Sequence, residues 1–175
     1  MTQPLNSSAF MRLTRLRVVR LSHGDLVNGI LNPMPIGYDE MNLSWIVGRV
    51  LVDVSFHSPN LWCFSFSPTE NITVECLWRL IQEGKIFRTS HDHGQLFGLD
   101  APVDAARNAI EVLTGVVITN AHIHEATADI QIAFGTEKCL EIIADSSGYE
   151  NWQLSAPNGR CYVAQGGGQL CTWTK

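Results

Sequence analysis

The sequence predicts an α+β domain in which two pseudo-symmetric antiparallel β-meander repeats, residues 48–99 and 115–173, are joined by one central helix at about residues 101–114. Two observations predict the repeats. Landmark residues recur in the same order in both ranges, and short runs of alternating apolar and polar residues succeed one another from Trp45 onward. A third observation, one amphipathic stretch between the two ranges, predicts the helix.

The repeat depends on a cluster of shared landmarks. In both ranges a Trp-x-Leu triplet is followed by a glycine and then by Gly-Gln-Leu. The matched pairs are Gly48 and Gly115, Val50 and Val117, His57 and His124, Phe66 and Phe134, Trp78 and Trp152, Leu80 and Leu154, Gly84 and Gly159, Gly94 and Gly168, Gln95 and Gln169, and Leu96 and Leu170. Unrelated meanders of similar length would also share turn glycines, so the order of the landmarks is what favours a repeat.

Period-2 patterns predict the strands of both repeats. Residues 50–57 alternate in this way, residues 72–80 are expected to form one strand, and residues 95–99 close the first repeat. In the second repeat, Asn158-Gly159 is a strong signal for a two-residue hairpin, because both positions tolerate a positive φ.

The helix between the repeats has start and stop signals. Asp100 can cap it, and Pro102 suits its first turn. Gly115 ends it, where a left-handed residue is wanted. The predicted apolar stripe consists of Val103, Ala106, Ile110 and Leu113. This stripe needs a cover, and the β-surface of the two repeats is the nearest one.

Residues 1–44 differ in character from the rest of the chain and are predicted to form an N-terminal arm, which leaves residues 45–175 as a single domain. The first 24 residues contain four arginines and no acidic residue. Such a composition also has the character of an organelle-targeting segment, although a plain arm is favoured.

Charge and hydropathy limit the classes of partner. The chain has 12 basic and 17 acidic residues, for a formal net charge of −5, whereas nucleic-acid binding normally requires a basic face. No apolar run approaches the roughly 20 residues that cross a bilayer. Neither a nucleic acid nor a membrane is therefore expected as a partner.

The cysteines indicate the redox compartment. The chain has five, an odd number, and none forms a C-x-x-C pair. Cysteines among apolar or β-forming neighbours behave as small buried hydrophobes, so a reduced, cytoplasmic protein is expected.

Histidine offers the main alternative chemistry. Two H-x-H pairs occur, and on a strand this spacing places both imidazoles on one face, as a zinc or iron site needs. The histidines considered as metal ligands are His57, His91, His93, His122 and His124. The more ordinary interpretation is that His91 and His93 are polar turn residues, so no metal cofactor is expected unless these side chains converge.

Other catalytic signals are missing from the sequence. It contains no G-x-S-x-G motif, and no cysteine has flanking residues that would lower its pKa. Gly166-Gly167-Gly168 is not followed by Lys-Ser/Thr or by a predicted helix, so a tight hairpin or bulge is favoured over a phosphate-binding loop. No catalytic residue is predicted.

Aromatic residues indicate a binding loop. Tyr149, Glu150 and Trp152 lie where the second repeat carries extra residues, and exposed Tyr and Trp are common interface anchors. These three residues are the predicted partner-binding set. For Trp152 a place in the core is the alternative, because its counterpart Trp78 is expected there.

The C-terminal residues carry a resemblance. The stretch from Gly148 to Leu154, followed by Asn158-Gly159 and the stretch from Gly166 to Trp173, resembles the closing signature of a bacterial family of small β-rich proteins of unknown function. The signature is Gly-Tyr-Glu-x-Trp, a hairpin and Gly-Gly-Gly-x-Leu-x-x-Trp. Some small bacterial proteins of this kind resemble immunity proteins, which neutralise a toxin by binding it.

The leading hypothesis is a non-enzymatic cytoplasmic protein-binding module, immunity-like in character. The first alternative is a small metal-binding protein or metal-dependent enzyme that uses the clustered histidines. The second is a homodimer in which exposed edge strands of the repeats pair between two chains.

Overall fold

A computed structural model describes residues 34–35 and 43–174, except residues 125 and 158. The chain divides into residues 1–30 and 31–175, and the described residues all belong to the second unit. Most of the predicted N-terminal arm therefore lies outside the described residues.

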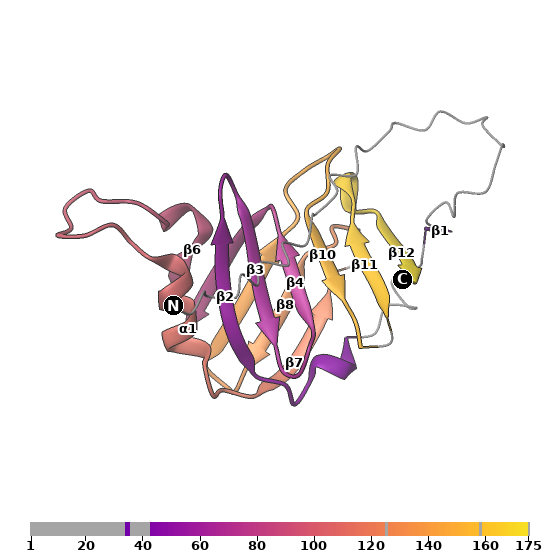
Figure 1. The fold of residues 1–175 in the computed structure, drawn as a ribbon, viewed down its shortest axis with the longest axis horizontal. Helices are drawn as coiled ribbons and strands as arrows, with labels where there is room; N and C mark the ends of the chain where they lie inside the picture. Colours follow the sequence, from indigo (N-terminus) through magenta and orange to yellow (C-terminus); the bar gives the residue numbers. More distant parts are fainter. Residues whose placement is uncertain (1–33, 36–42, 125, 158, 175) are drawn as a thin grey trace, which may run out of the picture. The chain divides into compact units, whose positions relative to one another are not determined.

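The described residues form two antiparallel β-sheets (Figure 1). The first sheet has the order β1-β12-β11-β10-β4-β3-β2 and the second has the order β6-β5-β9-β8-β7. The strands of the first sheet are β1 Met34–Pro35, β2 Leu51–His57, β3 Leu61–Phe66, β4 Asn71–Val74, β10 Trp152–Ser155, β11 Arg160–Ala164 and β12 Leu170–Thr174. Those of the second are β5 Leu77–Gln82, β6 Lys85–Thr89, β7 Ile118–Ile123, β8 Ile130–Phe134 and β9 Lys138–Ile143.

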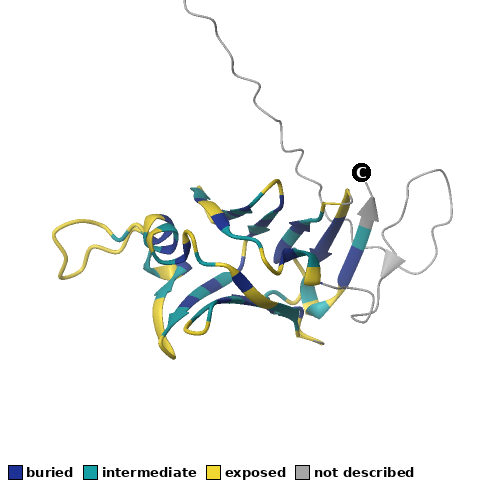
Figure 2. Ribbon diagram, turned by 90° about the horizontal axis from the view of Figure 1, so that it is seen from below, coloured by how far each residue is buried: buried dark blue, intermediate teal, exposed yellow. Residues whose placement is uncertain are grey.

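The core lies between the two sheets, where buried residues gather (Figure 2). Strands of both sheets alternate buried and half-buried residues, as β3 and β8 do. The ring centroid of Trp78 in the second sheet lies 5.0 Å from that of Trp62 and 5.5 Å from that of Phe64, both in the first sheet. Edge-to-face contacts of this kind add about 1 kcal/mol each to the gain from burial.

One α-helix, α1 Ala105–Leu113, packs against the edge strands β2 and β6. Its cap is Asp104, whose side chain accepts a hydrogen bond from the backbone N–H of Arg107, so the cap lies four residues after the predicted cap Asp100. Gly115 adopts a φ of +77° just beyond its end, as expected. Three 3-10 helices complete the described elements: η2 Ser44–Ile46, η3 Ser90–Asp92 and η4 Gly166–Gly168. None of the described helices has the length and apolar character needed to cross a membrane.

The predicted fold class is wrong. The protein is mostly β, and α1 does not join two meander repeats. The chain leaves the first sheet after β4 and continues as β5 in the second, and it returns to the first sheet as β10. Residues 48–99 and 115–173 therefore each supply strands to both sheets, and neither range forms a separate meander.

The predicted single strand at residues 72–80 shows why the period-2 pattern led to the wrong fold. The structure divides it into β4 and β5, which belong to different sheets. Val74, Cys76 and Trp78 are nevertheless all buried, because the inner faces of both sheets point into the same core. The alternation continues through the crossover, so a period-2 pattern cannot reveal where one sheet ends and the other begins.

Candidate functional site

Residues 145–151, here called the Tyr149 loop, connect β9 to β10 and place Tyr149 at the surface with 77% of it exposed. The buried side chain of Asn151 holds this loop. Its Oδ1 accepts from the backbone N–H of Ser146 at 3.0 Å, and its Nδ2 donates to the carbonyl oxygens of Tyr149 and Gln165, both at 3.3 Å. Ser146 Oγ accepts from the backbone N–H of Tyr149 at 3.0 Å. The tyrosine is therefore displayed on an ordered backbone.

The three consecutive glycines pack against this loop. A Cβ on Gly166 would overlap the backbone of Ser147 and Gly148, and a Cβ on Gly168 would overlap the carbonyl of Ala126. The backbone N–H of Gly167 donates to the carbonyl of Ser146 at 3.0 Å. Residues 166–168 are thus in close backbone contact with the Tyr149 loop and with the loop that contains Ala126. Only glycine fits at positions 166 and 168.

The predicted partner-binding residues differ in exposure. Tyr149 is exposed and Glu150 is half-buried. Trp152 is 1% exposed, and its Nε1 donates to the carbonyl oxygen of Ala128 at 2.8 Å. Trp152 therefore belongs to the core and offers no surface to a partner. Of the three, only Tyr149 presents most of its side chain to solvent.

Acidic groups surround the base of the Tyr149 loop. Burial, together with the nearby charge of Glu75, raises the pKa of the Glu150 carboxyl. Burial also raises the pKa of the Cys76 thiol to about 12, with a further contribution from Asp145. Cys76 is therefore a protonated, buried thiol near neutral pH, and carboxylates give the base of the Tyr149 loop a negative charge.

The five predicted metal ligands do not form a metal site in the described part of the chain. Within it, no group of three or more His, Cys, Asp or Glu side chains could hold a metal ion. His122 and His124 lie together, with their Nε2 atoms 3.4 Å apart, and His57 contacts Ser55. His91 is exposed.

His93 has a structural role. Its ring packs against Phe56 and Trp62, with centroid distances of 4.6 and 5.2 Å. Its Nδ1 accepts from the backbone N–H of Ala105 at 3.2 Å, which fixes the first residue of α1. This nitrogen is already occupied by a hydrogen bond and is not free to bind a metal.

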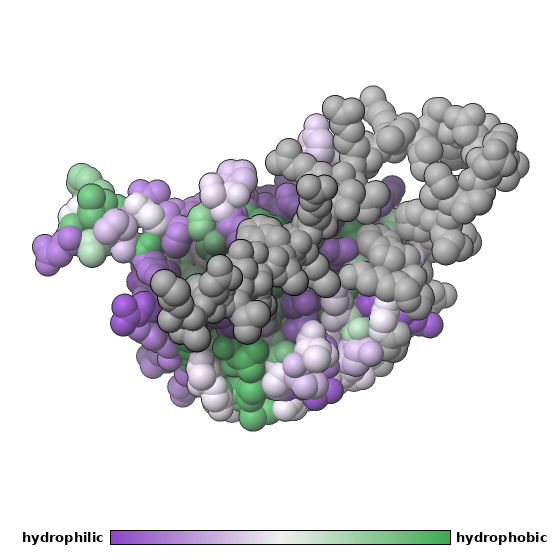
Figure 3. Space-filling model, in the orientation of Figure 1, coloured by the Kyte–Doolittle hydropathy of each residue, from purple (hydrophilic) through white to green (hydrophobic). Residues whose placement is uncertain are grey.

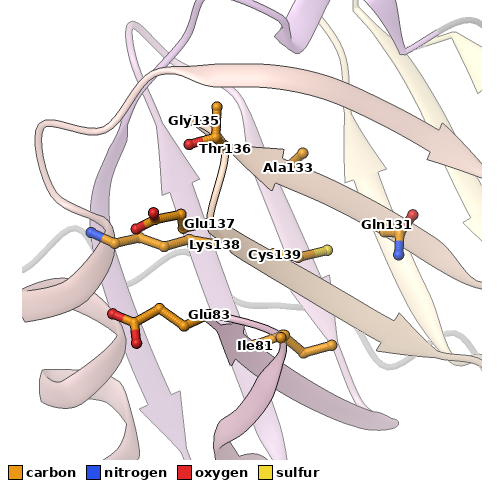
Figure 4. A pocket seen from close by; sticks show the side chains of 10 residues that line it. Ile81, Glu83, Gln131, Ala133, Gly135, Thr136, Glu137, Lys138 and Cys139 are labelled. Carbon is orange, nitrogen blue, oxygen red and sulfur yellow. The ribbon is translucent and has the colours of Figure 1, made fainter.

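A shallow hollow of about 500 Å³ opens beside the β5–β6 and β8–β9 turns (Figure 4). Glu83, Glu137 and Lys138 surround one side of it, and Lys138 Nζ donates to the carbonyl oxygen of Val112 at 2.7 Å. Burial, together with the charge of Glu141, raises the pKa of the Cys139 thiol in this hollow to about 11. Cys139 is therefore protonated near neutral pH and is not prepared to act as a nucleophile.

The sequence did not reveal a second exposed aromatic segment, residues 94–103, here called the Phe97 loop. Residues 95–99 were expected to form a strand, but they form turns in this loop, which extends beyond the sheets (Figures 1 and 2). Phe97 is 99% exposed, and Leu96 and Leu99 are each 52% exposed. Gly98, with a φ of +73°, was the available signal that a strand could not continue here.

The Phe97 loop is closed at its base. The backbone N–H of Gly94 donates to the carbonyl of Val103 at 2.8 Å, and that of Val103 donates to the carbonyl of Gln95 at 2.9 Å. Two backbone hydrogen bonds therefore join the two ends of the loop below its apolar tip.

No protein-family model, curated protein or solved structure matches this chain.

Proposed function

We propose that the chain is a non-enzymatic, cytoplasmic protein-binding module that contacts its partner through the Tyr149 loop. The observation that carries the proposal is the construction of this loop. A buried asparagine and close-packed glycines hold its backbone, while the aromatic side chain itself is left in solvent. Preorganised aromatic residues are the usual anchors of protein interfaces, because little conformational entropy is lost when they bind.

The charge around Tyr149 supports a partner with a basic binding face. Glu75, Asp145 and Glu150 all lie near the base of the loop, and the whole chain has a formal net charge of −5. In an immunity-like role, the partner would be the toxin. None of the five cysteines forms a disulfide, and this supports a reducing compartment.

Two alanine variants, one in each exposed loop, test the proposal. Wild-type protein, Tyr149→Ala and Phe97→Ala would each be used to capture partners from a bacterial lysate, and the captured protein would be purified and titrated by calorimetry. We expect Tyr149→Ala to weaken binding at least tenfold, which corresponds to about 1.4 kcal/mol, while Phe97→Ala binds like the wild type. Equal affinity of Tyr149→Ala and the wild type would rule out the Tyr149 loop as the contact.

A further inference from the structure

Groups at the surface differ in how narrowly they define what binds them. The apolar side chains of the Phe97 loop stand clear of the sheets (Figure 3), and an apolar surface of this kind suits many partners. Imidazole nitrogens are more selective, because besides a proton they bind a small set of metal cations. The pair His122 and His124 is therefore a surface feature whose chemistry identifies its ligand.

The two rings of this pair converge at their Nε2 atoms. These atoms lie 3.4 Å apart, whereas the ring centroids are 4.9 Å apart and the ring planes are inclined by 63°. The rings therefore approach each other by their Nε2 edges and do not stack. His122 is half-buried and His124 is exposed, so a cation can reach the two nitrogens from solvent.

The backbone holds both histidines in place. His122 pairs with Gln131 between β7 and β8. The backbone N–H of His124 donates to the carbonyl oxygen of Asp129 at 2.8 Å, and the carbonyl oxygen of His124 accepts from the backbone N–H of Ala128 at 3.0 Å. Alternate residues of an extended segment face the same side of a sheet, so the backbone itself directs both rings to one face. Little conformational entropy is lost when such a pair binds a ligand.

The separation of the two nitrogens matches one coordination geometry. With metal–nitrogen bonds of about 2.0–2.1 Å, two ligands of a tetrahedral ion lie about 3.3–3.4 Å apart, whereas neighbouring ligands of a square-planar or octahedral ion lie about 2.9 Å apart. The observed 3.4 Å is the tetrahedral distance. Zn²⁺ is the divalent cation that combines tetrahedral sites with imidazole ligands.

We propose that His122 and His124 form a two-histidine chelate that binds one Zn²⁺ through both Nε2 atoms, with water in the remaining positions of the tetrahedron. The contact between the two nitrogens is a hydrogen bond, so one of them carries a hydrogen. When Zn²⁺ binds, that hydrogen moves to Nδ1 of the same ring, and both imidazoles coordinate in their neutral form. His57, His91 and His93 take no part in this site.

A neighbouring carboxylate favours a cation at this place. Asp129 lies opposite His124, on the segment that leads into β8. Its Oδ1 accepts from the backbone N–H of Ala144 at 2.7 Å, and its Oδ2 accepts from the hydroxyl of Thr127 at 3.1 Å. Asp129 is therefore a fixed negative charge beside the pair and not a third ligand. Its charge attracts the cation, and the formal net charge of −5 acts in the same direction.

Calorimetric titration of the purified, reduced full chain with zinc chloride tests the proposal. We expect one Zn²⁺ per chain in the wild type. The dissociation constant should rise about tenfold or more in His122→Ala and in His124→Ala, because even residues that only support metal ligands are worth roughly tenfold in affinity. His91→Ala is the matched control, since this histidine is exposed and lies outside the pair, and it should bind like the wild type. Magnesium chloride should not bind at this site, because Mg²⁺ requires oxygen ligands.

Chemical modification of the wild type tests the same site without any variant. Diethyl pyrocarbonate acylates free imidazole nitrogens, and mass spectrometry of the digested protein locates the modified residues. With Zn²⁺ at ten times its dissociation constant, roughly one tenth of the sites stay free, so modification of His122 and His124 should fall about tenfold. Modification of His91 should not change. This measurement decides the question even if an alanine variant fails to fold.

Three results would overturn the proposal. The first is a wild-type chain that does not bind Zn²⁺, and the second is equal modification of the pair with and without the metal. The third is unchanged affinity in both alanine variants, which would assign the bound zinc to other groups, such as the half-buried thiols of Cys63 and Cys139. Tyr149→Ala should bind Zn²⁺ like the wild type, so the outcome is independent of the proposed function.

Discussion

The Tyr149 loop and the Phe97 loop both display an aromatic residue, but they are held in different ways. Polar side chains and close-packed glycines fix the Tyr149 loop. Two backbone hydrogen bonds close the Phe97 loop, and its exposed apolar side chains contribute little to holding it. Single side-chain substitutions should therefore disturb the Tyr149 loop more than the Phe97 loop.

The largest expected difference between the loops comes from the side chains that hold them. Asn151→Ala would leave one N–H and two carbonyl groups without their partner in a buried site, so we expect the free energy of unfolding to fall by about 3 kcal/mol. Gln95→Ala in the Phe97 loop removes one exposed hydrogen bond and should cost at most about 0.5 kcal/mol. Urea denaturation of both variants measures the difference. Similar losses would mean that the two loops are held alike.

The close backbone packing at the glycines gives the next effect. Gly166→Ala would force the backbone of Ser147 and Gly148 to move, at a cost of about 2 kcal/mol. Gly148→Ala is the matched control, because a Cβ there would meet open space, and its midpoint of unfolding should stay close to that of the wild type. If both variants unfold at the same urea concentration, the glycines do not tie the loops together.

Phe97 should be nearly neutral for folding. Because the side chain is 99% exposed, we expect Phe97→Ala to change the free energy of unfolding by less than about 0.5 kcal/mol. Phe64→Ala, in the core between the sheets, should cost about 3–5 kcal/mol. Thermal unfolding of the two variants, each at a concentration where it is monomeric, provides the measurement. A large loss in Phe97→Ala would show that the loop packs against its own chain.

The smallest effect is a pH dependence at the Tyr149 loop. Burial and the charge of Glu75 raise the pKa of Glu150 in the folded protein, so folding favours its protonated form. The stability that Glu150 contributes is complete below its unfolded pKa and is lost as pH rises through its folded pKa. Glu150→Gln should therefore stabilise the protein more at pH 7 than at pH 4, relative to the wild type. The same benefit at both values would exclude a raised pKa as the cause.

The alternation at residues 50–57 predicted a strand that the structure contains as β2, but it could not assign strands to sheets. Strands with one buried face, such as β3 and β8, show alternation that can be read directly. The sequence pattern does not show the crossover after β4. Val74 and Trp78 belong to different sheets, but both bury their side chains in the same core. The start of α1 also differed, because Asp100 and Asp104 are equally good caps and only the closing of the Phe97 loop decides between them.

The candidate site was predicted in part. The extra residues near Tyr149 directed attention to this loop, but the sequence could not separate the exposed Tyr149 from the buried Trp152, since both residue types occur in cores and at interfaces. The histidines illustrate the opposite case. Their spacing favoured a metal site, but His93 packs against Phe56 and Trp62. Spacing along the chain carries no information about such contacts.

The chain crosses from the first sheet to the second and back, and this order also determines when the protein can fold during synthesis. β4 pairs with β10, so Val74 cannot pair until Trp152 has been synthesised. In the same way β5 pairs with β9, and Leu77 cannot pair until Ile143 has been synthesised. Until the ribosome has released those later residues, β4 and β5 each have one unpaired edge in the nascent chain. Such edges are vulnerable to aggregation, and contacts between residues this distant along the chain form slowly. The growing chain therefore depends on its C-terminal third to close both sheets.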